Sequence, residues 1–292
     1  MKPLIPIFDD QFPQSASFGT GDLGIGPTYF NWYRGPEKIG NVCFVTESWF
    51  NRVDQIPYEH KVGIILEPPS INNVPYVWAL DSNNRSKFDF ILTHQNSYIN
   101  QHDYPGCLYY PFGGCWILPQ DRKLHNKTKN VSIIASWKTD TQGHKLRHEI
   151  INRFGNEIDV FGNGYKKVDN KIEALRDYKY TIVVENEKSD GWYTEKLIDA
   201  LVTGTIPIYW GDPCIADVFE SVLSFDTIDH LGFLLGNIKV ENQLPSNNIL
   251  TLDLNIYLDS ISAESFIIPE DWIFKNFILP TSLLEKFKFH FQ

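Results

Sequence analysis

Short apolar runs recur along the chain up to residue 210, and they alternate with longer amphipathic or polar stretches. A strand that is buried on both faces is a nearly continuous apolar run, whereas a longer amphipathic stretch is typical of a helix. Their alternation indicates a parallel sheet whose strands are joined by helices. We therefore predict an α/β protein with strands at 4–8, 42–46, 62–66, 88–93, 108–112, 131–136, 158–161, 181–184 and 205–210.

The segment 119–130 is polar, basic and without periodicity, which is typical of a linker. Five predicted strands precede it and four follow. The chain has 292 residues, and a single core rarely grows beyond about 250 to 300 residues. We predict two Rossmann-like domains, 1–122 and 123–292, the second ending in further helices. Such domains would face a cleft where ligands bind near the carboxyl ends of strands.

The composition narrows the choice of partners. A formal charge of −10 argues against long-range attraction to nucleic acid. The N-terminus lacks the apolar core of a signal peptide. The sequence also contains no run of about 18 apolar residues, the length that a membrane span needs. Four scattered cysteines without a Cys-x-x-Cys pattern predict free thiols and no zinc site. We expect a cytoplasmic protein whose basic aromatic tail, 279–292, either closes onto the core or gives weak peripheral membrane contact.

Two glycine-containing segments differ in what they predict. The pattern G-x-G-x-x-G at 19–24 follows no strand, so we interpret it as a glycine-rich loop. The segment 185–211 is more informative, because apolar residues within 197–202 fall on one face of a helix. Thr194 or Asp190 would cap the start of this helix, and a left-handed glycine at its end, Gly204, would stop it.

Glu195 and Lys196 then lie in the first turn of that helix, where exposed N–H groups and the helix dipole favour an anion. A carboxylate can accept hydrogen bonds from both hydroxyls of a ribose, and an ammonium group can neutralise phosphate. This pair predicts a site for a nucleotide diphosphate. The alternative is two ordinary charges on a solvated helix.

The residues around this pair form a longer pattern with fixed spacing. Its elements are Tyr178-Lys179-Tyr180, Glu185-Asn186, Thr194-Glu195-Lys196, Gly204, Ile206-Pro207-Ile208 and Gly211, with flanking stretches Ile133 to Ser136, Ile158 to Gly162 and Val222 to Asp226. The combination resembles the signature of the family-ten glycosyltransferases, the α-1,3/1,4-fucosyltransferases. The likeness covers roughly residues 131–230, and the first 120 residues match only faintly.

The resemblance implies a GT-B architecture with GDP-fucose held by the C-terminal domain. It implies that Arg147 and Lys196 hold the diphosphate, that Glu195 holds the ribose, and that Asn186 and Glu185 lie beside the donor. The alternative is that Arg147 is an ordinary charge on the side of its helix. In that case Lys145 would be the phosphate ligand.

This chain departs from the family pattern at two places. Trp192 and Tyr193 stand where bacterial relatives often have an aromatic residue and a valine before Thr194, so either ring could take the aromatic role. Glu187 replaces the usual Ser or Thr after Asn186. This second departure leaves open a sugar other than fucose.

An inverting transfer needs a base near the acceptor hydroxyl. Glu67 is our prediction, because it ends the apolar run 62–66 and two prolines follow it, which places it at the carboxyl edge of the sheet. The family places its proposed base at a similar strand end. His94 and Glu47 follow other strands and are alternatives. Trp78 is a candidate stacking face for the acceptor.

The sequence contains no Asp-x-Asp clamp for a metal, so we expect no required cofactor and expect cationic side chains to neutralise the diphosphate. The predicted partners are a GDP-sugar donor and a glycan acceptor. Alternatives are a transferase that uses another GDP- or UDP-sugar, and a non-catalytic module that binds a nucleotide sugar or a glycan.

Overall fold

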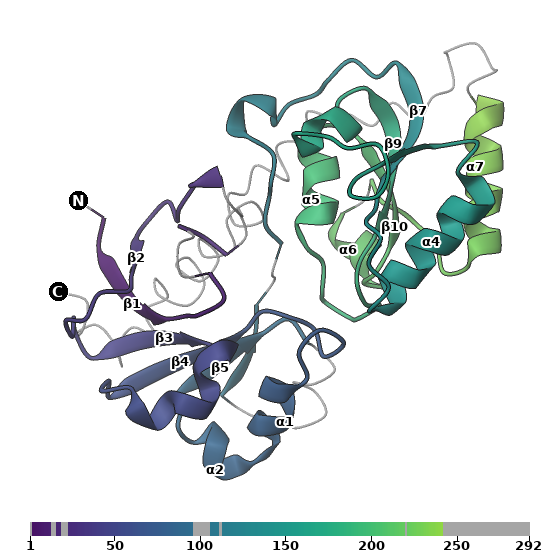
Figure 1. Cartoon of the computed structure of the whole chain (residues 1–292). Helices are drawn as coiled ribbons and strands as arrows, with labels where there is room; N and C mark the ends of the chain where they lie inside the picture. The colour runs from purple at the N-terminus through teal and green to yellow at the C-terminus, as the bar shows by residue number, and fades with distance from the viewer. Residues whose placement is uncertain are drawn as a thin grey trace. The chain divides into compact units, whose positions relative to one another are not determined.

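The computed structural model describes residues 2–12, 16–18, 23–95, 106–110, 113–219 and 221–241. These residues form two compact units (Figure 1). Among the described residues, the first contains the chain up to Trp116 together with Ser189–Glu195, and the second contains Ile117–Lys188 and the residues from Lys196 to Glu241. Most of the glycine-rich loop at 19–24 and the whole tail at 279–292 lie outside the described residues.

The first unit is built on a parallel sheet of six strands in the order β2-β1-β3-β4-β5-β6. Residues of β3 alternate between two apolar clusters, because Phe44 packs on one face of the sheet while Cys43 and Val45 pack on the other. The strands are β1 (Leu4–Phe8), β2 (Asn31–Tyr33), β3 (Val42–Thr46), β4 (His60–Ile65), β5 (Phe90–Thr93) and β6 (Cys107–Tyr109).

Among the described residues, three helical segments accompany this sheet. They are the 3₁₀ segment η2 (Glu47–Gln55) and the helices α1 (Val74–Leu80) and α2 (Ser82–Arg85). Phe50 and Val53 of η2 join Tyr76 and Ala79 of α1 in the apolar cluster on the face of Cys43 and Val45. The sheet is therefore buried on both faces, which explains why its strands are nearly continuous apolar runs.

The second unit contains a parallel sheet of five strands in the order β11-β10-β9-β7-β8. Its elements, in chain order, are η3 (Pro119–Asp121), β7 (Lys129–Ile134), α4 (Gln142–Phe154), β8 (Asp159–Phe161), η4 (Lys171–Ala174), β9 (Tyr178–Val184), α5 (Glu195–Val202), β10 (Ile206–Trp210), α6 (Ile215–Val218), β11 (Leu223–Ser224) and α7 (Ile228–Glu241). Figure 1 shows α4 and α7 on one side of this sheet and α5 on the other. Ile150 and Phe154 of α4 pack with Leu231 and Leu235 of α7 against the strands.

Both sheets have a topological switch point, at which consecutive connections leave in opposite directions. In the first unit the switch lies between β1 and β3, and in the second it lies between β7 and β9. Open parallel sheets bind ligands outside the carboxyl ends of the strands at this point. The topology therefore predicts ligand sites at the residues after β1 and β3 and at those after β7 and β9.

The predicted α/β class and all nine predicted strands are confirmed, with shifts of a few residues at several ends. Two strands were missed, β2 and β11, because runs of three and two residues are too short to show periodicity. The helix expected near 195–202 is α5, and Gly204 has the predicted left-handed φ of 67°. All four cysteines are free. Within the described ranges, no helix is long and apolar enough to cross a membrane.

Candidate active site

The start of α4 lies against the end of β9, at the switch point of the second unit. The Gly143 backbone N–H donates to the Asn186 carbonyl oxygen at 3.0 Å. A Cβ atom added to Gly143 would lie 1.7 Å from the Glu185 carbonyl oxygen. Glycine is required here because any side chain would separate the helix from the strand.

Arg147 is buried at this contact, with 6% of its surface exposed. Its Nε donates to the Val184 carbonyl oxygen at 3.1 Å, and its Nη2 donates to the same oxygen and to Asn186 Oδ1, the latter at 3.1 Å. The guanidinium thus fixes the backbone at the carboxyl end of β9 and orients the Asn186 side chain. Contact between Arg147 and a diphosphate stays a prediction.

Glu185 and Lys196 form an ion pair beside this arginine. Lys196 Nζ lies 3.2 Å from Glu185 Oε2, and the glutamate side chain is fully buried whereas that of the lysine is 28% exposed. The Glu185 backbone N–H donates to the Trp210 carbonyl oxygen at 2.9 Å, which ties the end of β9 to the end of β10. Glu185 therefore holds the first turn of α5 on the edge of the sheet while part of the Lys196 side chain reaches solvent.

Cations surround the start of α4. Burial lowers the pKa of His144, and the charges of Arg147, Lys138 and Lys196 lower it further, against an opposing effect of Asp140. The neutral imidazole caps α4, because Thr141 accepts from the His144 N–H at 3.2 Å while His144 Nδ1 accepts from the Thr141 N–H at 3.3 Å. The switch point is thus a positive site beside a capped helix start, and anions are favoured there.

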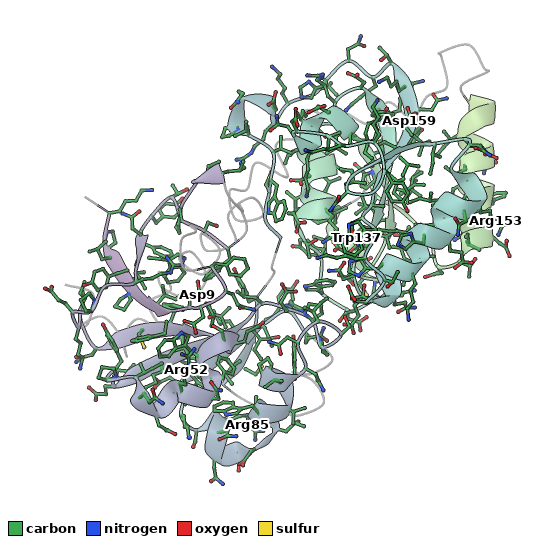
Figure 2. All side chains as sticks on the ribbon, viewed as in Figure 1. Asp9, Arg52, Arg85, Trp137, Arg153 and Asp159 are labelled. Carbon is green, nitrogen blue, oxygen red and sulfur yellow. The ribbon has the colours of Figure 1, made fainter. Side chains whose placement is uncertain are left out.

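Sequence reasoning missed two members of this site. His144 occupies the third helical position, where the usual capping box has Glu or Gln, so the common pattern is absent. Trp137 follows β7 and is 67% exposed, which leaves its indole accessible at the same edge of the sheet. The only signal in the sequence was a tryptophan among polar residues directly after an apolar run. Figure 2 labels Trp137 in the second unit.

The segment Ser189–Glu195 belongs to the first unit, although the chain on both sides of it belongs to the second. Gln95 Nε2 donates to Ser189 Oγ at 2.7 Å, Tyr109 Oη donates to the Gly191 carbonyl at 3.1 Å, and Gly113 N–H donates to the Tyr193 carbonyl at 3.1 Å. Hydrogen bonds therefore hold the segment on residues at or after the carboxyl ends of β5 and β6.

Within this segment, Trp192, Tyr193 and Thr194 are buried, and Glu195 is half-buried. Glu195 opens α5 as predicted, and Thr194 pairs with Gly113 in a β-bridge. The roles predicted for these four residues toward a donor stay predictions. The structure groups them with the first unit, apart from Arg147, Glu185, Asn186 and Lys196.

Glu47 and Glu67 come together in the first unit at the ends of β3 and β4. Glu47 Oε2 accepts from the backbone N–H groups of Leu66 at 2.6 Å and Glu67 at 3.3 Å. Its Oε1 accepts from Gln11 Nε2 at 3.0 Å and from Asn72 Nδ2 at 3.3 Å. Both oxygens of Glu47 are therefore engaged in holding the turn that carries Glu67.

Burial raises the pKa of Glu47 to about 7, against the lowering effect of the N–H groups that it accepts from. Glu47 is 6% exposed, whereas Glu67 is in the partly exposed class. Of the two carboxylates, Glu67 is the one whose side chain solvent can reach, and Glu47 fixes its backbone.

His94 and Trp78, the other predicted residues, have different surroundings. His94 is fully buried, neither of its ring nitrogens has a hydrogen-bond partner, and its ring lies 5.7 Å from that of Trp192. Burial lowers its pKa to about 3, which keeps it neutral and weakens it as a base. Trp78 packs against Phe50 and Phe88, with ring centroids 5.3 and 5.8 Å away. Its acceptor role stays a prediction.

Each of the two units is built on a parallel sheet, and the second has a positive switch point suited to an anionic ligand. Among the described residues, no three His, Cys, Asp or Glu side chains are placed to hold a metal ion. Residues 124–239 match the C-terminal model of glycosyltransferase family 10 (fucosyltransferase). The resemblance seen in the sequence is thereby confirmed.

The curated relatives match short stretches of the chain. The α-(1,3)-fucosyltransferase FucT of Helicobacter pylori is 50% identical over 57 residues, which are 20% of this chain and 12% of that protein. GDP-fucose protein O-fucosyltransferase 3 of Bos taurus is 31% identical over 104 residues, 35% of this chain and 20% of that protein. The matches thus span only a small part of these relatives' lengths.

One solved structure is similar over the whole chain. A crystal structure of an α1,3-fucosyltransferase aligns with a TM-score of 0.51 at 17% identity, covering 100% of this chain and 91% of the other. At this level of identity the likeness concerns the fold. It confirms the predicted GT-B architecture.

Proposed function

We propose that the protein is a glycosyltransferase that moves L-fucose from GDP-fucose to a hydroxyl group of a glycan, with inversion at the anomeric carbon. The observation that carries the proposal is the positive switch point of the second unit, where Lys196 and Arg147 meet at the end of β9 in a segment of the fucosyltransferase family. The relative from Bos taurus, whose name specifies GDP-fucose, supports this choice of donor.

In this proposal the second unit stabilises the leaving diphosphate, together with Glu195 of the first unit. As the bond between the anomeric carbon and the phosphate oxygen breaks, its electron pair stays on that oxygen, and negative charge grows there. The Lys196 ammonium and the N–H groups at the start of α5 are fixed before the reaction, and fixed charges and dipoles usually make the largest contribution to catalysis. Glu195 holds the ribose, and Arg147 keeps the site in shape through Val184 and Asn186.

The first unit supplies the base. Glu67 takes the proton of the acceptor hydroxyl as its oxygen attacks the anomeric carbon on the face opposite the diphosphate. Glu47 is a positioning residue that holds the Glu67 backbone through its Oε2 atom. His94 is disfavoured as the base because it is fully buried. No metal is required in this scheme, so chelation by EDTA should leave turnover unchanged.

The proposal is tested first by binding and then by turnover. A thermal-shift panel of GDP, UDP, NAD and CoA should raise the melting temperature with GDP alone, because a ligand of the folded state stabilises it by mass action. Nucleotide release is then measured with GDP-fucose, other GDP-sugars and UDP-sugars in the presence of glycans. Release from another donor favours a different sugar, GDP binding without release favours a non-catalytic module, and no shift with GDP contradicts the proposal.

A further inference from the structure

A cavity of about 430 Å³ opens at the switch point of the first unit, on the sheet that carries Glu67. Its walls include Phe8 with Asp9 and Asp10 at the end of β1, Tyr33 and Arg34 at the end of β2, and Trp49 of η2. Its volume lies within the range of about 300 to 1,000 Å³ that is usual for small-molecule sites. The cavity thus occupies the place where parallel sheets bind ligands.

The charges at this cavity are balanced. Arg34 Nη2 lies 3.1 Å from Asp9 Oδ2, and Arg52 donates to Asp10 Oδ2. The hydrogen bond from Arg52 holds the pKa of Asp10 below its usual value, so this carboxyl group is charged at neutral pH. Figure 2 labels Asp9 and Arg52 in the first unit. Asp9, Asp10 and Arg34 line the cavity, and Arg52 pairs with Asp10 from beyond the lining. No excess positive charge is therefore present to attract an anion such as a nucleotide.

Aromatic rings supply the apolar part of the lining. Trp49 and Tyr33 are partly exposed, and Phe8 meets the Trp49 ring edge-on at a centroid distance of 5.2 Å. Trp49 Nε1 donates to Asp10 Oδ1 at 2.8 Å, which fixes the indole beside the carboxylate. The Arg52 guanidinium covers one face of the Trp49 ring, 3.8 Å from its centroid. The other face of Trp49 and the Tyr33 ring, next to fixed hydrogen-bonding groups, suit a sugar ring, whose C–H groups contact the rings while its hydroxyls both donate and accept.

Hydrogen bonds connect the cavity to the base. Asp9 Oδ1 accepts from the Gln11 N–H at 2.9 Å, and Gln11 Nε2 donates to Glu47, which accepts from the Glu67 N–H. Only β3 separates β1 from β4, so these strands are about 10 Å apart. Two neighbouring units of an oligosaccharide can bridge such a separation.

We propose that this cavity binds a neutral saccharide unit of the acceptor, next to the unit whose hydroxyl group receives the sugar. The assignment of this saccharide to the acceptor rests on the proposed transferase function. The cavity itself is defined by the first unit alone. Its charge balance predicts a preference for neutral saccharides over anionic ones.

The test is a titration of the full chain with lactose, cellobiose and N-acetyllactosamine, each in the presence of saturating GDP and followed by ligand-observed NMR. The wild type should bind at least one of these, and 3′-sulfated lactose should bind more weakly than lactose. Asp10→Asn and Tyr33→Leu should each weaken saccharide binding about tenfold or more. Asp54→Asn is the matched control, since Asp54 is an exposed carboxylate of the same unit paired with Lys87 outside the cavity.

The GDP titration separates this proposal from the proposed function. If both cavity variants keep wild-type saccharide affinity, or if the wild type binds none of the three sugars with GDP bound, the saccharide site is refuted. If saccharide binding weakens equally in Asp54→Asn, the assignment of the saccharide to this cavity is also refuted. If GDP fails to bind while the cavity variants still lose saccharide affinity, the transferase function fails and the saccharide site stands. Asp10→Asn keeps the test decisive should Tyr33→Leu fold poorly.

Discussion

The switch points of the two units are built on the same strand order, yet they gather different side chains. Between β7 and β9, Lys196 and Arg147 create a positive site beside two helix starts. Between β1 and β3, Asp9 and Asp10 are each matched by an arginine, and aromatic rings complete the lining. The comparison indicates that topology selects the place where a ligand binds, whereas charge selects its chemical class.

The largest effect should come from the base of the first unit. Glu67→Ala should lower turnover by about 10² to 10⁴-fold, the usual contribution of general base catalysis, while GDP affinity should stay unchanged because the proposed nucleotide site lies in the second unit. Turnover is measured by nucleotide release and GDP affinity by calorimetry. Glu59→Gln changes an exposed carboxylate of the same unit and should leave both quantities unchanged. Normal turnover in Glu67→Ala would remove Glu67 from this role.

The buried carboxyl group beside that base should make the stability of the fold depend on pH. The pKa of Glu47 is raised from 4.5 to about 7 by burial. A raised pKa means that the folded state binds the proton more tightly, so this contribution is complete below about pH 4.5 and is lost as the pH rises through 7. Relative to Glu47→Gln, the wild type should lose stability on the order of 3 kcal/mol between pH 4.5 and pH 8.

Urea unfolding of both proteins at several pH values measures this difference. Parallel curves for the wild type and Glu47→Gln across this range would show that Glu47 keeps an ordinary pKa. The result would also argue against the burial of the Glu47 carboxyl group that holds the turn carrying Glu67.

The cation of the second unit should affect donor binding. Lys196→Ala should weaken GDP binding by about 1.5 to 3 kcal/mol, the usual value for a charged hydrogen bond, and should also destabilise the fold because Glu185 keeps a buried charge. Lys171→Ala is a matched control, since Lys171 pairs at 2.8 Å with the equally buried Asp199 of the same unit. The control should lower stability and leave GDP affinity unchanged. Equal GDP affinities in the two variants would argue against phosphate contact by Lys196.

The smallest changes concern two glycines of the second unit. Gly143→Ala should destabilise the protein by about 1 to 3 kcal/mol and weaken GDP binding, because its Cβ would collide with the Glu185 carbonyl. Gly236→Ala in α7 meets no atom within 4 Å and should stabilise the helix by about 0.5 to 1 kcal/mol. Melting curves compare the two. A harmless Gly143→Ala would show that close approach of α4 to β9 is not needed.

The sequence predicted the strands well because each long strand is buried on both faces and therefore reads as an apolar run. It also brought together Arg147, Glu185, Asn186 and Lys196, since their spacing follows a family pattern. It did not predict that Glu47 holds Glu67, because the two meet through a hydrogen bond across neighbouring strands and no local pattern records such a bond. Nor did it reveal the cavity, because the walls come from segments that lie together only through the order of the strands in the sheet.

The placement of Ser189–Glu195 limits how the protein can be divided. A fragment that begins at Ile117 would carry these residues away from Gln95, Tyr109 and Gly113, the groups that receive them. A fragment that ends at Trp116 would expose the surface that they cover. Separate expression of the two halves should therefore give poorly soluble material, and co-expression of both fragments should restore it.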